Sequence, residues 1–438
     1  MFKYPDRIIN DVRKAWKSMK RGDPELSALP PGPVLRRLLE VAYHASFMTE
    51  EGRKPGFRIA YCPKLKMQNE YGSRDGLGSI LPIEFPQCRE FTPAEIVGLA
   101  PAVDYRRALI CVHRAEARER SDNESLHIWG LIDSGSSWWH RTRGGADLAY
   151  SPPNVFTVSS TDVGNITVCI GGHVLLRLQH GQVSEPATQP LSEGPLAEIF
   201  RTATDEMYET EVTELKSADR ERDQPKVFYK PYLTRILHHV AEASHGAALL
   251  VVRDPMGSHE QKLAEGLHTK YPCLYDRAWR LLIDKAVQEV KYSRLEWRLF
   301  EGGEMTKEDI HELVHLGYLM KHIDRLLSDS AEFVASLSAV DGAIVLTDRF
   351  RVLGFGAEVR VGSRLERVKR VSDNLGKSGE YVRLESFGTR HRSAFRFCWR
   401  RKNAVAFIVS QDGGVKAAKR VGPDLLLWPD IEFGSLGL

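Results

Sequence analysis

The sequence lacks paired cysteines, long apolar runs and an excess of charge of either sign. Its six cysteines are scattered along 438 residues without a C-x-x-C pair. This excludes zinc-ribbon and thioredoxin-type sites and is typical of a reducing compartment. No window approaches the ~18 uncharged apolar residues of a spanning helix, so we expect none. With 61 basic and 58 acidic residues, the net charge is only +3, which provides no general attraction to nucleic acid or membranes.

The opening residues, MFKYPDRIINDVRKAW, carry charge through every turn and no apolar run, so we expect no secretory signal. We therefore expect a cytoplasmic protein that has neither membranes nor nucleic acid among its partners. What the chain does contain, 42% hydrophobic and 27% charged residues, is a globular balance. Its length exceeds one ordinary core and predicts two or three domains.

The pattern of apolar residues divides the chain into four regions. Residues 1–55 predict two helices, the second opened by Pro33. Residues 56–190 contain short runs of β-branched and aromatic residues separated by Gly, Pro, Asn and Asp, which predict a β-rich domain. Residues 191–228 are charged and helical, and predict a linker. Residues 229–438 alternate helices with strands, which predicts an α/β or α+β domain whose mixed sheet is flanked by helices.

Two local features of the β-rich region and one of the last region also carry predictions. Gly171-Gly172, between two strand-like runs, is typical of a tight hairpin. The tryptophans at 129, 138 and 139 have side chains that can line a pocket, but packing is the favoured interpretation. The long basic stretch 360–386 predicts a solvated loop, with a lid over a ligand or a partner surface as alternatives.

The tripeptide Asp341-Gly342-Ala343 stands immediately before the apolar run IVL. This places a carboxylate at a strand end, where it is suited to hold Mg²⁺ or Mn²⁺ or to accept a bond from a ribose hydroxyl. Asp-Gly alone is a common turn pair, so the tripeptide by itself has an ordinary structural explanation.

The run Gly388-Thr389-Arg390-His391-Arg392 opens a predicted helix. Gly388 allows a ligand to approach the backbone closely. Thr389 is predicted to cap the helix, whose N-terminus favours an anion. Arg390 and Arg392 have forked donors for phosphate oxygens, and His391 is suited to bind phosphate or a metal. Without its context, Arg-His-Arg is usually a solvated basic cluster.

Ser410 ends the predicted strand AVAFIVS, and strand ends are where α/β sheets bind ligands. The serine alone indicates nothing. The order of the three features, each next to the expected helix or strand, is what predicts a triphosphate site.

In this order the motifs resemble those of the diadenylate cyclase (DisA_N) family. The resemblance rests on LSAVDGAIVL (337–346), FGTRHRSAFRFC (387–398) and AVAFIVS (404–410), and extends over about 229–425. It implies a nucleotidyltransferase that condenses two ATP into cyclic di-AMP and releases pyrophosphate, using Mg²⁺ or Mn²⁺. Because one GTRHR site holds one ATP, it also implies a homodimer, or a higher homo-oligomer, with facing catalytic domains.

The resemblance implies a role for each motif residue. Asp341 engages the ribose 3′-hydroxyl and the metal. Thr389, Arg390 and Arg392 bind phosphates, and His391 lies at the metal and phosphate end.

By the same resemblance Ser410 contacts the triphosphate, but the residues after it depart from the family. Many members continue Ser-Glu-Glu, with a glutamate on the metal, whereas this chain has Gln411 and Asp412. Gln411 carries no charge, so Asp412 is the remaining candidate metal ligand. This departure motivates an alternative: a nucleotide-binding sensor without turnover.

His311-Glu312-Leu313-Val314-His315 matches the H-E-x-x-H motif, in which two histidines on one helix face bind Zn²⁺ and the glutamate is a general base. A zinc peptidase is therefore a further alternative. The surrounding run TKEDIHELVHLGYLMKHIDRLL has leucines at helical spacing, so a structural amphipathic helix is the favoured interpretation.

In the first half of the chain, HIWGLIDSG (127–135) and NITVCIGGHVLLRLQHG (165–181) resemble the probable sensor domains, called DACNV, that precede some of these cyclases. The resemblance implies a regulatory β-rich domain whose ligand is unknown.

Overall fold

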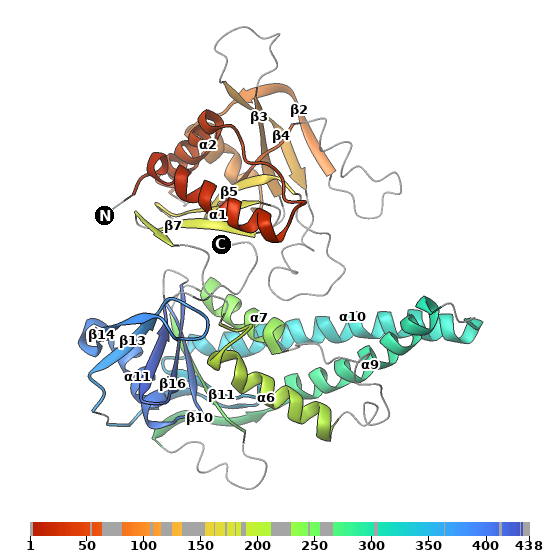
Figure 1. The fold of residues 1–438 in the computed structure, drawn as a ribbon, viewed down its shortest axis with the longest axis vertical. Coiled ribbons are helices and arrows are strands. Elements are labelled where there is room, and N and C mark those ends of the chain that lie inside the picture. The colour runs from red at the N-terminus through yellow and green to blue at the C-terminus, as the bar shows by residue number, and fades with distance from the viewer. Residues whose placement is uncertain are drawn as a thin grey trace. The chain divides into compact units, whose positions relative to one another are not determined.

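The computed structural model contains two compact units, which are described separately (Figure 1). Unit 1 comprises the described residues up to 184, and unit 2 those from 190 to 431. The structure describes residues 3–52, 55–63, 81–105, 108–114, 125–133, 154–161, 163–170, 173–179, 181–184, 190–211, 229–243, 246–254, 266–301, 305–362, 364–410, 414–429 and 431.

Unit 1 is built on a mixed sheet with the strand order β2-β4-β3-β1-β5-β6-β7-β8. At its centre β1 (Phe57–Tyr61) runs parallel to β3 (Ala108–Arg114) and antiparallel to β5 (Phe156–Ser160). These strands correspond to β-branched runs in the sequence, as predicted. The other strands are β2 (Leu81–Glu90), β4 (Leu126–Asp133), β6 (Ile166–Ile170), β7 (His173–Gln179) and β8 (Gln182–Ser184).

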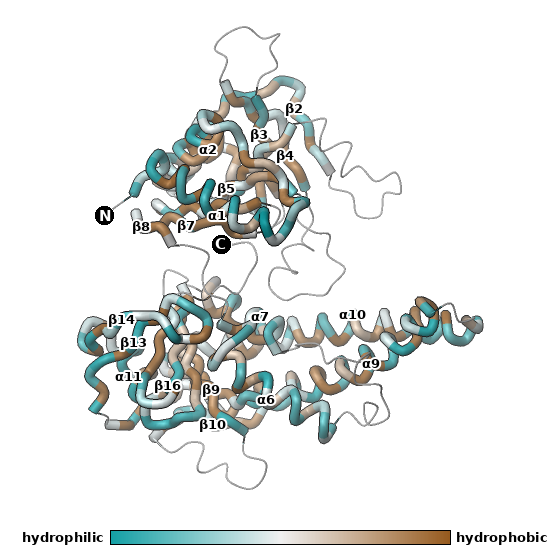
Figure 2. The backbone as a smooth tube through the Cα atoms, viewed as in Figure 1, coloured by the Kyte–Doolittle hydropathy of each residue, from teal (hydrophilic) through white to brown (hydrophobic). Residues whose placement is uncertain are grey.

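Helices α1 (Ile9–Gly22) and α2 (Gly32–Ala45) cover one face of this sheet, and their apolar residues share its core. They confirm the two helices predicted for residues 1–55 and form the helical cap of the β-rich unit. Much of α1 is hydrophilic outside its buried stripe (Figure 2). A short helix, α4 (Pro93–Leu99), joins the same core after the N-cap Thr92, whose side chain accepts a bond from the backbone of Glu95.

Among the described α-helices and strands of unit 1, the sequence analysis missed α4, β2 and the short β8. The strand β2 contains Pro82 and Pro86, which argue against a strand because proline cannot donate to the ladder. The structure places β2 at the edge of the sheet, where that loss is tolerated.

Trp129 packs in the core of unit 1, as favoured from the sequence. It is buried, and its Nε1 donates to the carbonyl of Cys62 at 3.0 Å. The other two tryptophans of this region, and the pair Gly171-Gly172, lie outside the described residues, although β6 and β7 on either side of the glycines do pair antiparallel. All six cysteines are free thiols.

Unit 2 is built on a second mixed sheet, with the order β10-β12-β11-β9-β15-β16-β17-β13-β14. The central strand β9 (Ala247–Val252) runs parallel to β11 (Ala343–Thr347) and antiparallel to β15 (Val405–Val409). All three are buried along their length, which explains their continuous apolar sequences. The outer strands are β10 (Leu267–Tyr275), β12 (Val352–Val359), β13 (Arg367–Val371), β14 (Gly379–Arg383), β16 (Val415–Val421) and β17 (Asp424–Trp428).

Helices cover both faces of this sheet, which confirms the predicted fold class. On one face α6 (Pro195–Thr210), α7 (Tyr229–Glu242), α9 (Arg277–Phe300) and α10 (Lys307–Ser336) form the larger core. On the other face α11 (Thr389–Arg400) packs against a separate cluster. The pair α9–α10 extends away from the sheet (Figure 1). In the part of the chain that the structure describes, no helix combines the length and the apolar character needed to cross a membrane.

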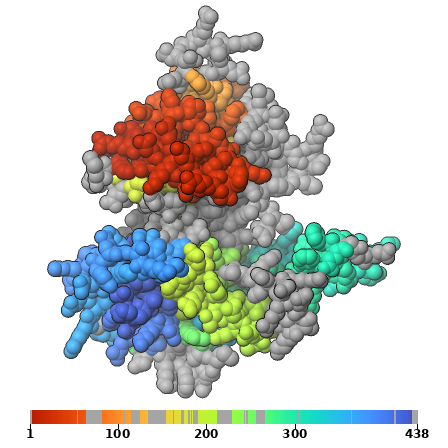
Figure 3. Space-filling model, viewed as in Figure 1, coloured from red at the N-terminus to blue at the C-terminus, as the bar shows by residue number. Residues whose placement is uncertain are grey.

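The described part of the charged stretch 191–228 contains α6 (Pro195–Thr210), and this helix is buried in unit 2. The Phe200 ring stacks on Tyr229 and on Phe350, with centroids 5.4 and 5.6 Å apart. Burying one such side chain contributes about 1.5–3 kcal/mol. In the space-filling view α6 lies beside the C-terminal strands (Figure 3). The helix is therefore part of the unit 2 core and not a solvated connection.

The prediction of a solvated loop at 360–386 was wrong. The strands β13 and β14 lie in this stretch and extend the sheet beyond β17. Val368 and Val371 are buried, while the other residues of β13, Arg367, Lys369 and Arg370, are charged. β14 is the edge strand of the sheet and β13 is its neighbour. The side chains of both are mostly polar, and this hid the strands in the sequence.

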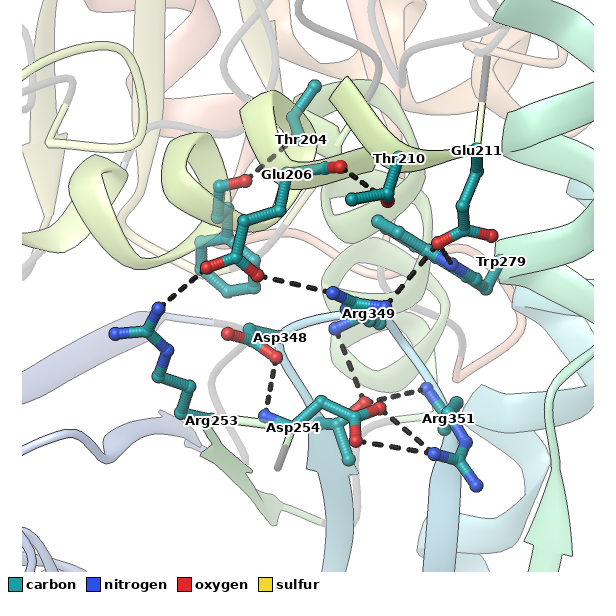
Figure 4. A network of polar contacts seen from close by, with 12 residues as sticks. Thr204, Glu206, Thr210, Glu211, Arg253, Asp254, Trp279, Asp348, Arg349 and Arg351 are labelled. Atoms are coloured by element: carbon teal, nitrogen blue, oxygen red, sulfur yellow. Dashed lines mark hydrogen bonds and ion pairs between the residues drawn. The ribbon is translucent and has the colours of Figure 1, made fainter. Parts of the chain in front are cut away.

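A polar network fastens α6 to the turn between β11 and β12 (Figure 4). Glu206 accepts bonds from Arg253 at 2.7 Å and from Arg349 at 3.2 Å. Glu211 accepts from Arg349 at 3.4 Å and from Trp279 Nε1 at 3.2 Å. The two acidic side chains at the C-terminal end of α6 thus bind the end of β9, the turn between β11 and β12, and α9.

Asp348 is the buried carboxyl beside this network, and its Oδ1 accepts the backbone N–H of Asp254 at 2.7 Å (Figure 4). Burial raises the pKa of Asp348 to about 7; the Asp254 carboxylate adds to this effect, while Arg349 and Arg253 oppose it. The folded state therefore keeps a proton that the unfolded state releases near pH 4. Protonation of Asp348 thus favours the folded state. Its contribution to the free energy of unfolding is fully present below about pH 4 and is lost as the pH rises to about 7.

The Asp348→Asn variant should lack this pH dependence, because the amide stays neutral and keeps an oxygen for the Asp254 N–H. From pH 5 to pH 8 we expect its free energy of unfolding to rise relative to wild type by on the order of 2 kcal/mol. Urea denaturation of both proteins at the two pH values measures the difference. A gap between them that does not change with pH would contradict the assignment.

Candidate functional site

A cavity of about 510 Å³ lies in unit 2, on the face of the sheet that α11 covers. Strands β9 to β12 and the first turns of α11 supply its walls. The lining residues are Ala248, Leu250, Lys270, Asp341, Gly342, Ala343, Ala357, Glu358, Val359, Thr389, Arg390, Ser393 and Ala394.

The sheet register brings the tripeptide 341–343 to this cavity. Ala343, the first residue of β11, pairs with Ala248 of β9 on one side and with Ala357 of β12 on the other. Asp341 is exposed and stands two residues before the strand, at the end of the sheet. The predicted strand-end position of this carboxylate is therefore correct.

Gly342 has a conformation that only glycine adopts readily, with φ at +126°. A Cβ at this position would lie 2.4 Å from the carbonyl carbon of Gly356 in β12. The two backbones therefore touch here, and this contact fixes the direction in which the chain leaves Asp341. Gly342 shapes the site through its backbone.

The helix α11 directs its N-terminus at the cavity, but Thr389 is not its cap. Gly388 occupies the N-cap position and Thr389 is the first helical residue. Gly388 has no side chain to satisfy the first N–H groups, which remain available to a ligand. Thr389, Arg390 and, one turn later, Ser393 line the cavity.

The other two side chains of the GTRHR run, His391 and Arg392, are not among the described residues that line the cavity. The ring of His391 is half-buried between those of Phe387 and Phe395, with both centroids 6.0 Å away. Arg392 reaches back along the helix, and its Nη2 donates to Thr389 Oγ1 at 3.4 Å. Of the described residues of the run, Thr389 and Arg390 are the ones that reach the cavity wall.

Ser410 follows β15 at the same end of the sheet, because Val409 pairs with Ala247 next to Ala248. Its Oγ accepts a bond from Lys416 Nζ at 3.4 Å. It is not one of the described residues that line the cavity. The candidate metal ligand Asp412 and its neighbour Gln411 lie outside the described residues.

Three polar residues of the cavity were not predicted, namely Lys270, Glu358 and Ser393. Lys270 Nζ donates to the backbone oxygen of Asp341 at 3.5 Å and lies 3.9 Å from Glu358 Oε1. Ser393 could have been found, because it lies four residues after Thr389 on a predicted helix and therefore on the same face. Lys270 belongs to β10 and Glu358 to β12, and no motif in either strand marks them as site residues.

The cavity combines opposite charges in a small volume. Arg390, Lys270 and the α11 N-terminus contribute positive charge, while Asp341 and Glu358 contribute two carboxylates. Such a set is suited to a ligand that has an anionic group as well as hydroxyl or amino donors.

The H-E-x-x-H run lies on α10, where His311, Glu312 and His315 are exposed and Leu316 is buried. Thr306 and Asp309 start the helix with a reciprocal capping box. Among the described residues, no group of three or more His, Cys, Asp or Glu side chains is placed to hold a metal ion. The run is part of an amphipathic helix, as the leucine spacing indicated.

The comparison with protein families concerns unit 1. Residues 24–133 match the family described as probable sensor domain DACNV. This domain is found in diadenylate cyclases. The DACNV match begins before α2 and ends with β4, so it includes most of the run HIWGLIDSG and stops before the run at 165–181. No curated protein matches the chain.

Proposed function

We propose that unit 2 is a nucleotidyltransferase that condenses two ATP into cyclic di-AMP, and that the DACNV-containing unit 1 regulates it. One observation carries the proposal: a single cavity is lined both by the tripeptide 341–343 and by the first turn of the GTRHR helix. These motifs are distant in the sequence, and the sheet and α11 bring them to the same cavity. The DACNV match supports the regulatory part.

The size and charge of the cavity support a nucleotide ligand. About 510 Å³ lies within the ~300–1,000 Å³ range of small-molecule sites. The α11 N-terminus with Thr389 and Arg390 suits phosphates, because open N–H groups and a forked guanidinium both donate to phosphate oxygens. The apolar walls of β9 and β12 suit the base.

The lining residues also fit a divalent cation. Mg²⁺ is commonly bound by one or two carboxylates together with substrate phosphates, and the cavity offers Asp341 and Glu358. Asp341 would hold the ion. When bound, the ion would neutralise charge on the reacting phosphates. The family-implied ligands His391 and Asp412 receive no support from the described geometry.

In the proposed reaction, each ribose 3′-oxygen forms a bond to the α-phosphorus of the other ATP. The bond from that phosphorus to pyrophosphate breaks, and pyrophosphate takes the electron pair. The hydroxyl proton passes to Asp341 or to water. Most of the acceleration comes from positioning and charge neutralisation. One cavity holds one nucleotide, so two copies must face each other.

Titration calorimetry with ATP tests the binding step. The proposal predicts saturation at one ATP per chain, and a chain that shows no saturable binding would contradict it. A second candidate, a nucleotide sensor without turnover, is favoured by the uncharged Gln411 after Ser410. ATP that binds and is never converted would support this second candidate.

A further inference from the structure

Lys270 is a charged cavity residue whose position the two sequence motifs do not explain. It belongs to β10, the edge strand that pairs antiparallel with β12. Its side chain crosses β12 towards the start of β11, where Nζ lies 3.5 Å from the backbone oxygen of Asp341. The ammonium therefore lies next to the backbone of the residue whose carboxylate is assigned to the reacting hydroxyl.

Two glycines make this crossing possible. Gly356 of β12 has φ at +63°, and a Cβ there would lie 3.3 Å from Lys270 Cβ and 3.4 Å from its Cδ. Gly342 in turn lies against the backbone of Gly356, where its own Cβ would be 2.4 Å from the carbonyl carbon. The Cβ at Gly356 would also lie 3.1 Å from Val340 Cγ1, so the lysine stem and the Val340 side chain both pack directly on the β12 backbone at Gly356.

The charge of Lys270 is only loosely compensated. Its ion-pair partner Glu358 is 3.9 Å away, and the side chains are 42% and 48% exposed. A pair this open contributes about 0–1 kcal/mol. A phosphate entering the cavity can therefore replace Glu358 as the partner of the ammonium at little cost.

Resting on the proposed function, we propose that Lys270 binds a phosphate of the nucleotide at the reacting end of the cavity, and is thus a further catalytic residue. Arg390 and the α11 N-terminus meet the phosphates from the opposite wall. Lys270 supplies a positive charge next to the Asp341 backbone, where it can neutralise the negative charge on the oxygens of the reacting phosphate.

The test compares ATP affinity, by calorimetry on the full chain, for wild type and three variants. Lys270→Met removes the charge and should raise the Kd about 10-fold or more, because hydrogen bonds between charged groups contribute about 1.5–3 kcal/mol. Lys270→Arg keeps the charge and should stay within about threefold of wild type. Lys321→Met, at an exposed position on α10, is the matched control and should bind like wild type.

The outcomes separate the inference from the function on which it rests. If wild type fails to bind ATP, the proposed function is contradicted and the role of Lys270 falls with it. If wild type binds and Lys270→Met binds equally well, Lys270 does not contact phosphate and only the inference fails. If Lys270→Arg loses as much affinity as Lys270→Met, the side chain acts through its shape and the inference is likewise overturned. Melting temperatures of the four proteins should agree.

Discussion

Replacing Asp341 with Asn is expected to slow cyclic di-AMP formation by about 10²–10⁴-fold, the usual contribution of a group that handles a proton in the transition state. The amide cannot accept the hydroxyl proton and is a poorer metal ligand. The affinity for ATP should change by less than about threefold, because the phosphates are assigned to α11. The fold should be unaffected, since Asp341 is exposed and Lys270 bonds to its backbone oxygen.

Initial rates and ATP titrations of the same preparations measure both effects. Asp329→Asn provides the matched control, because Asp329 is an exposed carboxylate of α10 away from the cavity, and it should leave both quantities at wild-type values. A normal rate in Asp341→Asn would remove the residue from the reaction. A loss of rate with an equal loss of affinity would mean that Asp341 acts in binding alone.

Replacing Arg390 with Ala should raise the Kd for ATP by about 10–100-fold, because it removes charge-assisted hydrogen bonds of about 1.5–3 kcal/mol. Arg390 is exposed in the first turn of α11 and lines the cavity. Alanine is a strong helix former, so the helix itself should persist. Arg392→Ala should have the smaller effect, since Arg392 reaches back to Thr389 and is not one of the described lining residues.

Arg400→Ala is the control for this comparison. Arg400 is exposed at the last position of the same helix, so its loss changes the total charge equally without touching the cavity. Calorimetry at one salt concentration ranks the three variants. An ordering in which Arg400→Ala binds as weakly as Arg390→Ala would show that net charge, and not position, determines the affinity.

Much of the site could be predicted because its motifs coincide with local structural signals. Asp341-Gly342 precedes an uninterrupted apolar run, and the structure has the strand where that run begins. The GTRHR run precedes a helical apolar pattern, and α11 begins at Thr389. Strand ends and helix starts can be recognised from neighbouring residues. That the two meet in one cavity depends on strand order, which neighbouring residues do not determine.

The unpredicted parts depend on contacts between segments that are distant in the sequence. Lys270 reaches the site because β10 pairs with β12 and because Gly356 leaves room beneath its stem. Nothing near Lys270 in the sequence indicates either contact. The same reason explains the edge strands β2 and β14, and also β13 next to β14, which have prolines or charges where the central strands have apolar residues. Edge strands of this kind resemble loops in sequence.

The most direct test of the central claim is to incubate the 438-residue chain with ATP and Mn²⁺ or Mg²⁺ and to identify the nucleotides by mass spectrometry. Asp341→Asn is assayed in parallel. The account predicts cyclic di-AMP with two pyrophosphates per product in the wild type, and almost none in the variant. ATP that binds to the wild-type protein yet remains unchanged would contradict the cyclase assignment and favour a nucleotide sensor.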